Sequence, residues 1–576
     1  MPLHNADIAA IFGEIADLLE IRGENPFRIR AYRNAARTVT EFGQDIKSLF
    51  DQGGELPKLP GIGDDLHAKI HEIAATGSCR LFDRLRKEFP PAISELLRLP
   101  GLGPKRVKVL YDRLRVRTVD ELRQAASAGK VRELPGFGEK TEARILQALA
   151  AHADQGRRFR LATATQYADA LVAYLDRVPG VKRAVVAGSF RRMRETVGDL
   201  DLLVVAAAGS SVMEQFCAYD EVREILAQGG TRASVMLKSG LQVDLRLVSA
   251  PSYGAALHYF TGSKAHNIAI RRLAQARGLK LNEYGVFRGA SRIAGDTEES
   301  VFKAVGLPYI PPELREERGE IEAARSGTLP RLITLQDIRG DLHAHTAASD
   351  GHDTVAQMAQ AAQASGLTYL AITEHSRRLA VAHGLDPLQL ARQIDEIDRL
   401  NETLAGFTLL KGIEADILED GSLDLPDAVL ARLDLVIGAV HSAFALPRRK
   451  QTERILRAMD HRYFTLLAHP SGRLIGSREP YDVDMLKIVR KAKSRGCFLE
   501  LNAQPDRLDL HDIHCQMARD EGVLVSINSD AHSTLDFAHL KYGIGQARRG
   551  WLAPGDVLNT RTLAALKPLI RSTMQR

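Results

Sequence analysis

Two aspartates stand two positions apart in the middle of the chain, Asp199 and Asp201, and a Gly188-Ser189 pair lies about ten residues before them. The apolar run over 202–205 predicts a β-strand, in which residues two apart point to the same face. Neighbouring carboxylates repel each other unless cations neutralise them, and Mg²⁺ prefers hard oxygen ligands together with phosphates. The segment therefore predicts metal-assisted phosphoryl transfer; the alternative is a surface hairpin with an acidic strand start.

A third carboxylate, Asp244, stands between apolar residues on a second predicted strand. Two-metal transfer needs such a group, because the attacking hydroxyl must be held against one ion. Downstream, the aromatic pair Tyr259-Phe260 precedes Thr-Gly-Ser and is followed by Asn267 and Arg271. The pair could pack under a nucleotide sugar while Asn267 and Arg271 touch bases; a buried aromatic pair before a turn is the alternative.

A second set of metal-binding side chains occupies the C-terminal part of the chain. From Asp337 onward, strand-like apolar runs alternate with predicted helices such as 355–365 and 484–495, which indicates a parallel barrel. Each candidate ligand falls at the C-terminal end of such a run, where the loops of a barrel converge: His343, His345, Asp350, His375, Glu414, His441, His469, Asp530 and His532. Six histidines and three carboxylates exceed the needs of one ion, so two or three ions of Zn²⁺, Mn²⁺ or Fe²⁺ fit better.

A Leu-Pro-Gly-x-Gly pattern is repeated in the N-terminal part, beginning at Leu59, Leu99 and Leu134, and each copy precedes a predicted helix. Its glycines allow a tight turn whose N–H groups can face a phosphate. The pattern therefore predicts helix-hairpin-helix motifs, which hold DNA backbones without reading sequence; a single copy would be an ordinary helix connection. The predicted DNA-contacting residues are Gly61, Gly63, Gly101, Gly103, Gly136 and Gly138.

Composition narrows the class of protein further. The chain has 576 residues and a net charge of +6, a mild basic excess that is compatible with a polyanionic partner. Four scattered cysteines without a C-x-x-C pair indicate a reducing compartment and neither disulfides nor a cysteine zinc site. No signal peptide or membrane span is visible, so we expect a cytoplasmic protein without a membrane partner. Residues 1–155 are expected to be helical, and strands begin near Val185, with a helix over 213–228 between them.

Residues 1–312 resemble the X family of DNA polymerases in the spacing from Gly188 to Asp201, the Val-Asp-Leu-Arg strand and the Tyr-Phe-Thr-Gly-Ser run. The resemblance implies that Asp199, Asp201 and Asp244 bind two Mg²⁺ ions and catalyse nucleotidyl transfer. It also implies a set of nucleotide-binding residues: Gly188, Ser189, Arg192, Gly198, Tyr259, Phe260, Gly262, Asn267 and Arg271. Among them, Ser189, Arg192 and Gly198 would hold the triphosphate, and Arg271 would face the template.

The N-terminal residues are similar to the small lyase domain of the same family, with Lys69 where the family has its Schiff-base lysine. A lysine attacks an abasic sugar aldehyde when burial or nearby cations lower its pKa. Asp65 stands where the vertebrate enzyme has a second lysine, and Phe27 where it has a histidine. The alternative is that Lys69 only binds a 5′-phosphate.

The C-terminal ligand series resembles that of the PHP (polymerase and histidinol phosphatase) domain, with no ligand missing. This resemblance implies a distorted (β/α)₇ barrel with a trinuclear cluster that hydrolyses phosphoesters. Arg473, Arg377 and Arg378 are candidate phosphate contacts, or else solvated side chains.

Together these patterns predict a multidomain α/β protein: a helical helix-hairpin-helix N-terminal region, an α+β nucleotidyltransferase palm with a small thumb, and a C-terminal barrel. The expected segments are a lyase-like domain (1–85), a fingers-like domain with two hairpin motifs (86–155), a palm (156–250), a thumb (251–312), a linker (313–335) and the PHP domain (336–576).

The expected function is gap-filling DNA synthesis in base excision repair, with an intrinsic 3′–5′ exonuclease or processing of blocked and abasic DNA ends in the barrel. AP endonuclease and 5′-deoxyribose-phosphate lyase are candidate further activities. The expected partners are gapped or primer–template DNA and dNTPs, bound by a monomer. One alternative is a tailing nucleotidyltransferase with a small-molecule phosphatase barrel, against which the hairpin repeats and the aromatic pair argue. Another is a non-catalytic DNA-end-binding scaffold, against which the intact carboxylates and barrel ligands argue.

Overall fold

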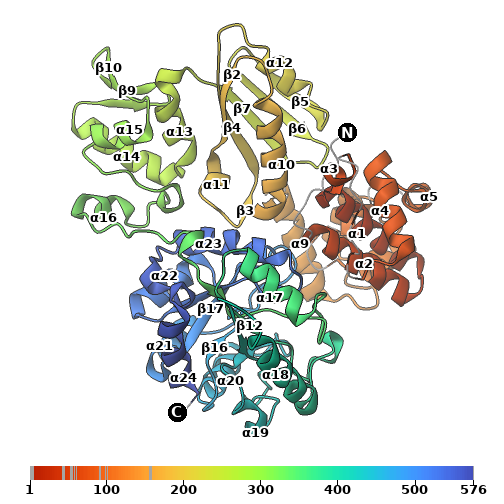
Figure 1. Ribbon diagram of the computed structural model, residues 1–576. Helices are drawn as coiled ribbons and strands as arrows, with labels where there is room; N and C mark the ends of the chain where they lie inside the picture. Colours follow the sequence, from red (N-terminus) through yellow and green to blue (C-terminus); the bar gives the residue numbers. More distant parts are fainter. Residues whose placement is uncertain are drawn as a thin grey trace. The chain divides into compact units, whose positions relative to one another are not determined.

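The structure is a computed structural model (Figure 1) that describes residues 5–41, 46–51, 56, 59, 61–89, 93–97, 99, 102–154 and 158–574. The chain divides into two compact units. Unit 1 contains Met1–Phe159, Thr165–Pro179 and Ser211–Leu245, and unit 2 contains Arg160–Ala164, Gly180–Ser210 and Arg246–Arg576. Among the described residues, no helix is long and apolar enough to cross a membrane.

The first part of unit 1 is helical, as the sequence predicts. Its helices are α1 (Asn5–Arg22), α2 (Pro26–Glu41), α3 (Ile46–Asp51), α4 (Asp64–Thr76), α5 (Arg80–Glu88), α6 (Ile93–Leu97), α7 (Pro104–Leu114), α8 (Val119–Ser127) and α9 (Glu139–Asp154).

The three Leu-Pro-Gly-x-Gly copies share one backbone hydrogen bond. Gly61 and Gly136 have φ angles of +67° and +82°, a region that favours glycine. In each copy the N–H of the residue between the glycines donates to the leucine carbonyl: Ile62 to Leu59 at 3.1 Å, Leu102 to Leu99 at 3.0 Å, and Phe137 to Leu134 at 3.0 Å. The repeat in the sequence is therefore accompanied by the same backbone hydrogen bond in all three copies.

The rest of unit 1 corrects one expectation about secondary structure. The helix expected over 213–228 is only α12 (Val212–Cys217), and β5 (Val222–Gln228) follows it, paired antiparallel with β6 (Arg232–Leu237). Glu, Leu, Ala and Gln favour helices, but backbone pairing with a neighbouring strand overrides that weak preference. These strands belong to a five-stranded sheet of order β2-β4-β7-β6-β5. The remaining elements are α10 (Leu161–Leu175) and β7 (Gln242–Leu247).

Unit 2 contains the strand–turn–strand segment that carries the first two aspartates. β2 (Val181–Val186) pairs antiparallel with β4 (Asp199–Ala206), and the short helix α11 (Gly188–Arg191) and strand β3 (Thr196–Val197) lie between them in the chain. A compact subdomain follows, with a sheet of order β10-β9-β8. It comprises α13 (Tyr253–Thr261), α14 (Lys264–Ala276), β8 (Lys280–Asn282), β9 (Gly285–Arg288), β10 (Ser291–Ala294) and α15 (Glu298–Ala304).

The segment over 313–335, expected as a linker, packs against this subdomain. It contains α16 (Glu320–Ser326), and Leu314, Ile321 and Ala324 belong to the same buried apolar cluster as Phe302. Its buried charges are paired, Arg315 with Glu298 and Glu320 with His266, because burying an unpaired charge would be costly.

Residues 340–574 form the parallel barrel that the sequence predicts. Seven strand positions follow one another along the chain: β11 (Gly340–Asp341), β12 (Tyr369–Ile372), β13 (Thr408–Lys411) continued by β14 (Glu414–Asp416), β15 (Ile437–Ala439), β16 (Leu466–Leu467), β17 (Phe498–Asn502) and β18 (Val525–Asn528). A parallel bridge between Ala344 and Ala531 connects the two ends of this series. In Figure 1 the strands lie inside a ring of helices. These helices are α17 (Val355–Ala364), α18 (Pro387–Asn401), α19 (Asp427–Leu430), α20 (Arg448–Met459), α21 (Met485–Arg495), α22 (Asp512–Glu521), α23 (Leu540–Arg549) and α24 (Leu563–Thr573).

Candidate active sites

The first site is built on β4. Leu200 is buried, while Asp199 is exposed and Asp201 is half-buried. The two carboxylates therefore lie on the face of the strand that points away from the core. Gly188 approaches this strand with a φ of +63°, and a Cβ at that position would collide with Asp201 Oδ2. Glycine is therefore needed to bring the Gly-Ser turn against the carboxylate.

The third carboxylate is fixed by hydrogen bonds on β7. Asp244 is 9% exposed and accepts from the Ser234 hydroxyl and from Gln242 Nε2 at 2.9 Å. The guanidinium of Arg232 lies 3.6 Å from its Oδ1. These donors hold the side chain in one orientation.

Two consecutive arginines connect the Gly-Ser turn to the subdomain that follows it. Arg191 forms a bidentate pair with Glu298, at 2.9 and 2.6 Å, and also donates to Thr261 Oγ1. Burial raises the pKa of Glu298, but Arg191 and Arg315 outweigh it and lower the pKa to about 2. Arg192 donates to the Thr261 carbonyl at 2.8 Å. Ser189 and Gly198, the other predicted triphosphate contacts, are both half-buried in the same segment.

The predicted nucleotide pocket is ordered by one asparagine. Asn267 Nδ2 donates to the Tyr259 carbonyl at 2.6 Å and to the Gly262 carbonyl at 3.2 Å. A Cβ on Gly262 would collide with the Asn267 side chain, which explains the glycine. The rings of Tyr259 and Phe260 meet edge to face with centroids 5.1 Å apart, and Arg271 is exposed one helical turn beyond Asn267. The structure thus brings these five predicted residues together.

In the N-terminal helices, Lys69 lines a cavity of about 340 Å³ with Arg28, Arg80 and Arg84. Its amine is paired with Asp65. Burial lowers the pKa of Lys69, but the hydrogen bond to Asp65 outweighs it and raises the pKa above its usual value. A raised pKa is the opposite of what an attacking amine needs.

The hairpin glycines are exposed, with open space where a side chain would stand: Gly61, Gly63, Gly103, Gly136 and Gly138. Gly101 lies outside the described residues.

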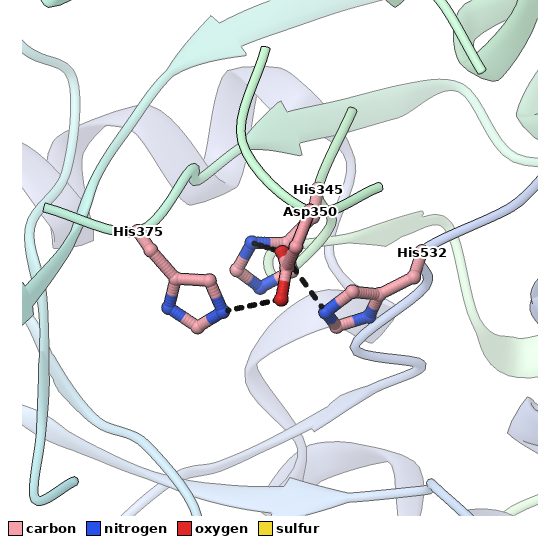
Figure 2. A group of neighbouring side chains, drawn as sticks. All are labelled: His345, Asp350, His375 and His532. Atoms are coloured by element: carbon pink, nitrogen blue, oxygen red, sulfur yellow. Dashed lines mark ion pairs between the residues drawn. The ribbon is translucent and has the colours of Figure 1, made fainter. Parts of the chain in front are cut away.

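The barrel brings its predicted ligands together at the C-terminal strand ends. Figure 2 shows the Asp350 carboxylate between three imidazoles, 3.4 Å from His532, 3.5 Å from His375 and 3.9 Å from His345. Within each of three groups the ligand atoms lie within 4.8 Å of one another: His345, Asp350, His375 and His532; His343, His345 and Asp530; and His375, Glu414 and His441. His345 and His375 each belong to two groups, so the groups are contiguous.

Glu414 is the carboxylate at the centre of the barrel site. Its Oε2 lies 2.7 Å from His375 Nδ1, and its Oε1 lies 3.3 Å from His441 Nε2 and 2.9 Å from His469 Nε2. All nine predicted ligands are therefore neighbours, His469 through Glu414. A carboxylate placed in this way suits a cluster with shared ligands better than a single ion.

The donor atoms of this site fit metal ions. Among the described residues, Nε2 of His343 and both ring nitrogens of His345 are buried without a hydrogen-bond partner. Unpaired buried polar atoms are costly, and lone pairs aimed at a common centre are what a cation requires.

The electrostatics of the cluster also demands positive charge. Burial disfavours imidazolium, yet the surrounding carboxylates raise the pKa of His375 to about 10 and of His532 to about 9. Burial raises the pKa of Glu414 and Asp530, but the imidazoles hold both well below the usual range. Bound divalent cations would replace these protons.

Sequence reasoning missed a residue that orients the ligands. Glu500, fully buried on β17, accepts from His343 Nδ1 at 2.7 Å and from the His469 backbone N–H at 2.7 Å. Asn502 Nδ2 donates to Asp530 Oδ2 at 2.9 Å. Such partners fix the tautomer and direction of a metal ligand. A glutamate inside the apolar run 498–501 was the signal.

Sequence reasoning also missed Arg507. Its guanidinium lies 3.8 Å from Asp530 Oδ2 and donates no hydrogen bond among the described residues, and the side chain is 20% exposed. Arg473, the predicted phosphate contact, is instead occupied: it donates to Leu508 and Arg507 carbonyls and to Glu195 at 2.7 Å. Arg377 and Arg378 are exposed beside His375.

Comparisons with known proteins find matches along most of the chain. Family models match a helix-hairpin-helix domain at residues 3–79, a SAM-like helix-hairpin-helix tandem at 93–151, the DNA polymerase beta thumb at 256–316 and the PHP domain at 341–504. A probable phosphatase of Acetivibrio thermocellus is 33% identical over 34% of this chain and 80% of its own length. DNA polymerase lambda of Arabidopsis thaliana is 26% identical over 54% of this chain and 62% of its own length.

One relative covers both halves. The DNA polymerase/3'-5' exonuclease PolX of Bacillus subtilis is 38% identical over 99% of this chain and 100% of its own length. This chain therefore belongs to the PolX family, the bacterial family X DNA polymerases with helix-hairpin-helix segments and a C-terminal PHP domain.

Proposed function

We propose that this chain fills short gaps in DNA at the site around β4 and removes 3′-terminal nucleotides at the barrel site, in base excision repair. Nine side chains with metal-ligand chemistry meeting at one rim of the barrel, in a chain that also carries the β4 aspartates, are the observation on which this rests. A protein that was only a phosphatase would not need the aspartates on β4.

At the polymerase site, Asp199, Asp201 and Asp244 would hold two Mg²⁺ ions, which supply charge neutralisation and activation of the primer 3′-hydroxyl when bound. Ser189 and Arg192 would hold the triphosphate, with Gly188 and Gly198 giving it room. Tyr259 and Phe260 would lie against the sugar and limit ribonucleotides, with Gly262 and Asn267 shaping the pocket and Arg271 on the template side. These residues position the reactants, which is most of catalysis in phosphoryl transfer.

At the barrel site, the nine ligands would hold two or three ions of Zn²⁺, Mn²⁺ or Fe²⁺, which supply Lewis acidity to phosphodiester hydrolysis when bound. Glu500 keeps the proton of His343 on Nδ1 and so leaves Nε2 free as a ligand. Arg507, with its unused donors beside Asp530, would contact the scissile phosphate. The same site would cleave abasic DNA.

The hairpin glycines would contact DNA phosphates through open backbone, Gly101 by sequence analogy, so binding should be salt-dependent and independent of sequence. We propose a monomer that binds gapped or primer–template DNA and dNTPs in the cytoplasm. Its four cysteines are free, which suits that reducing compartment.

For Lys69, the ion pair with Asp65 favours 5′-phosphate binding over Schiff-base formation. Borohydride trapping on a 5′-deoxyribose-phosphate substrate separates the two. A covalent adduct that Lys69→Ala abolishes would establish the lyase.

The decisive experiment uses a one-nucleotide gapped duplex with Mg²⁺ or Mn²⁺, with and without dNTPs. Asp201→Ala should lose extension and keep degradation, and His343→Ala should do the reverse. His461→Ala is the matched control, because this barrel histidine pairs with Asp427 at 3.1 Å and is in none of the three metal-binding groups. Extension by Asp201→Ala would refute the polymerase assignment, and parental degradation by His343→Ala would refute the nuclease assignment.

A further inference from the structure

Arg192, the arginine that is proposed to bind the triphosphate, forms an ion pair with a carboxylate in this structure. Arg192 Nε lies 3.0 Å from Glu316 Oε1, and both side chains are largely buried, at 13% and 11% exposed. Glu316 is the last residue of the segment that matches the thumb model, 124 residues further along the chain. Carboxylate and phosphate oxygens are alternative acceptors for the same guanidinium donors.

The barrel holds this carboxylate from the other side. Arg549, the last residue of α23, donates from Nη1 to Glu316 Oε1 at 2.9 Å and to the Arg192 carbonyl at 2.9 Å. Its Nη2 donates to Asp512 Oδ2 at 2.7 Å, and Arg549 and Asp512 are each only 3% exposed. Arg318 also pairs with Asp512, at 2.9 Å. Oε1 of Glu316 thus accepts hydrogen bonds both from Arg192, which follows the Gly-Ser turn, and from Arg549 of the barrel.

The charges in this network are matched so that Glu316 stays ionised. Burial raises its pKa, but Arg192 and Arg549 outweigh that effect and lower the pKa below the usual range. If an anionic ligand binds Arg192 in place of Glu316, Glu316 remains paired with Arg549. Arg194 Nη1 also lies 3.7 Å from Glu316 Oε1. Releasing Arg192 therefore does not leave a buried carboxylate without a partner, which would be costly.

We propose that Glu316 competes with the triphosphate of the incoming nucleotide for Arg192, and that Arg549 retains Glu316 when the nucleotide displaces it. This inference rests on the proposed role of Arg192 in nucleotide binding. Glu316 is a positioning residue that sets nucleotide affinity, because it acts through Arg192 and does not touch the reacting atoms. Nucleotide binding then changes the charge pairing of Arg549, the residue at which the barrel helix α23 ends, because Glu316 is no longer shared with Arg192.

The test is Glu316→Gln in gap filling, with the dNTP concentration varied. Loss of the competing charge should lower the KM for dNTP about tenfold, with kcat little changed, since one charge-assisted hydrogen bond is removed from the nucleotide-free state. Equilibrium binding of a dNTP to the gapped-DNA complex in Ca²⁺ should tighten by the same factor. Glu313→Gln is the matched control, because Glu313 binds Arg548 of the same helix at 2.7 Å and does not contact Arg192; its KM should stay parental.

Three outcomes are separable. If Arg192→Ala leaves the KM for dNTP at the parental value, the nucleotide-binding role of Arg192 is wrong. If Arg192→Ala raises the KM and Glu316→Gln leaves it unchanged or raises it, the competition is wrong while the proposed function stands. Should Glu316→Gln fail to fold, Glu316→Asp tests the same idea: its shorter carboxylate should lower the KM in the same direction by a smaller factor, and an unchanged KM overturns the proposal.

Discussion

Glu500→Gln should weaken metal binding at the barrel without changing either the ligands or the polymerase. The carboxylate has two oxygens that accept on different sides: Oε1 from His343 Nδ1 (2.7 Å) and Asn528 Nδ2 (2.9 Å), and Oε2 from the His469 N–H (2.7 Å). Glutamine offers one oxygen, so its amide group must face one of these donors. In one outcome, a buried N–H loses its hydrogen-bond acceptor. In the other, His343 carries its proton on Nε2, the atom 3.5 Å from Asp530 Oδ1, and Nε2 then has no lone pair for a metal ion.

The expected loss is roughly 10–100-fold in metal affinity, as for other residues that orient metal ligands, or about 1.4–2.8 kcal/mol. The assay strips the protein with a chelator, then titrates Mn²⁺ or Zn²⁺ while recording thermal unfolding and primer degradation. Glu374→Gln is the control, since Glu374 is also fully buried but accepts from Thr346 and Gln393, which are not ligands. Metal affinity unchanged in Glu500→Gln, with both variants equally destabilised, would refute the reasoning.

Three further predictions test other parts of the molecule. Gly188→Ala places a Cβ against Asp201 at a φ that costs ~1–2 kcal/mol, so gap filling should fall roughly tenfold or more with degradation intact, and an equal loss of both activities would contradict it. Glu298 has a pKa of about 2 against 4.5 unfolded, so its stabilisation is complete above pH 4.5 and lost as the pH falls towards 2. The unfolding free-energy difference between the parent and Glu298→Gln should shrink by roughly 3 kcal/mol across that window, and a constant difference in urea titrations would rule this out. Arg507→Ala should lower kcat/KM for degradation roughly a hundredfold and leave gap filling unchanged; parental degradation would remove Arg507 from the site.

The barrel ligands were predictable because each comes after an apolar run that is typical of a buried strand. Position in the chain then implies position in space, since parallel strands end at one rim. The exact partners were not predictable. Glu500 lies within a strand instead of after it, and Arg507 lies in the loop beyond β17, so neither follows the strand-end pattern.

Two misjudged segments have different physical causes. Residues 222–228 have helix-favouring composition, but pairing with β6 makes them a strand. The charged run after residue 312 was expected to be a linker, yet Arg315 is fully buried against Glu298 and Glu320 against His266. Pairings between residues so distant in the sequence leave no local signal.

The closure of the barrel has a consequence for synthesis of the enzyme. The group of His343, His345 and Asp530 draws on the first and last strands, which the Ala344–Ala531 bridge joins. At ~5–20 residues per second, the ribosome needs roughly 10–40 s to pass from the first of these ligands to the last. The aspartates of the polymerase site emerge before either event. A nascent or truncated chain therefore contains the residues that extend DNA before it can assemble those that shorten it.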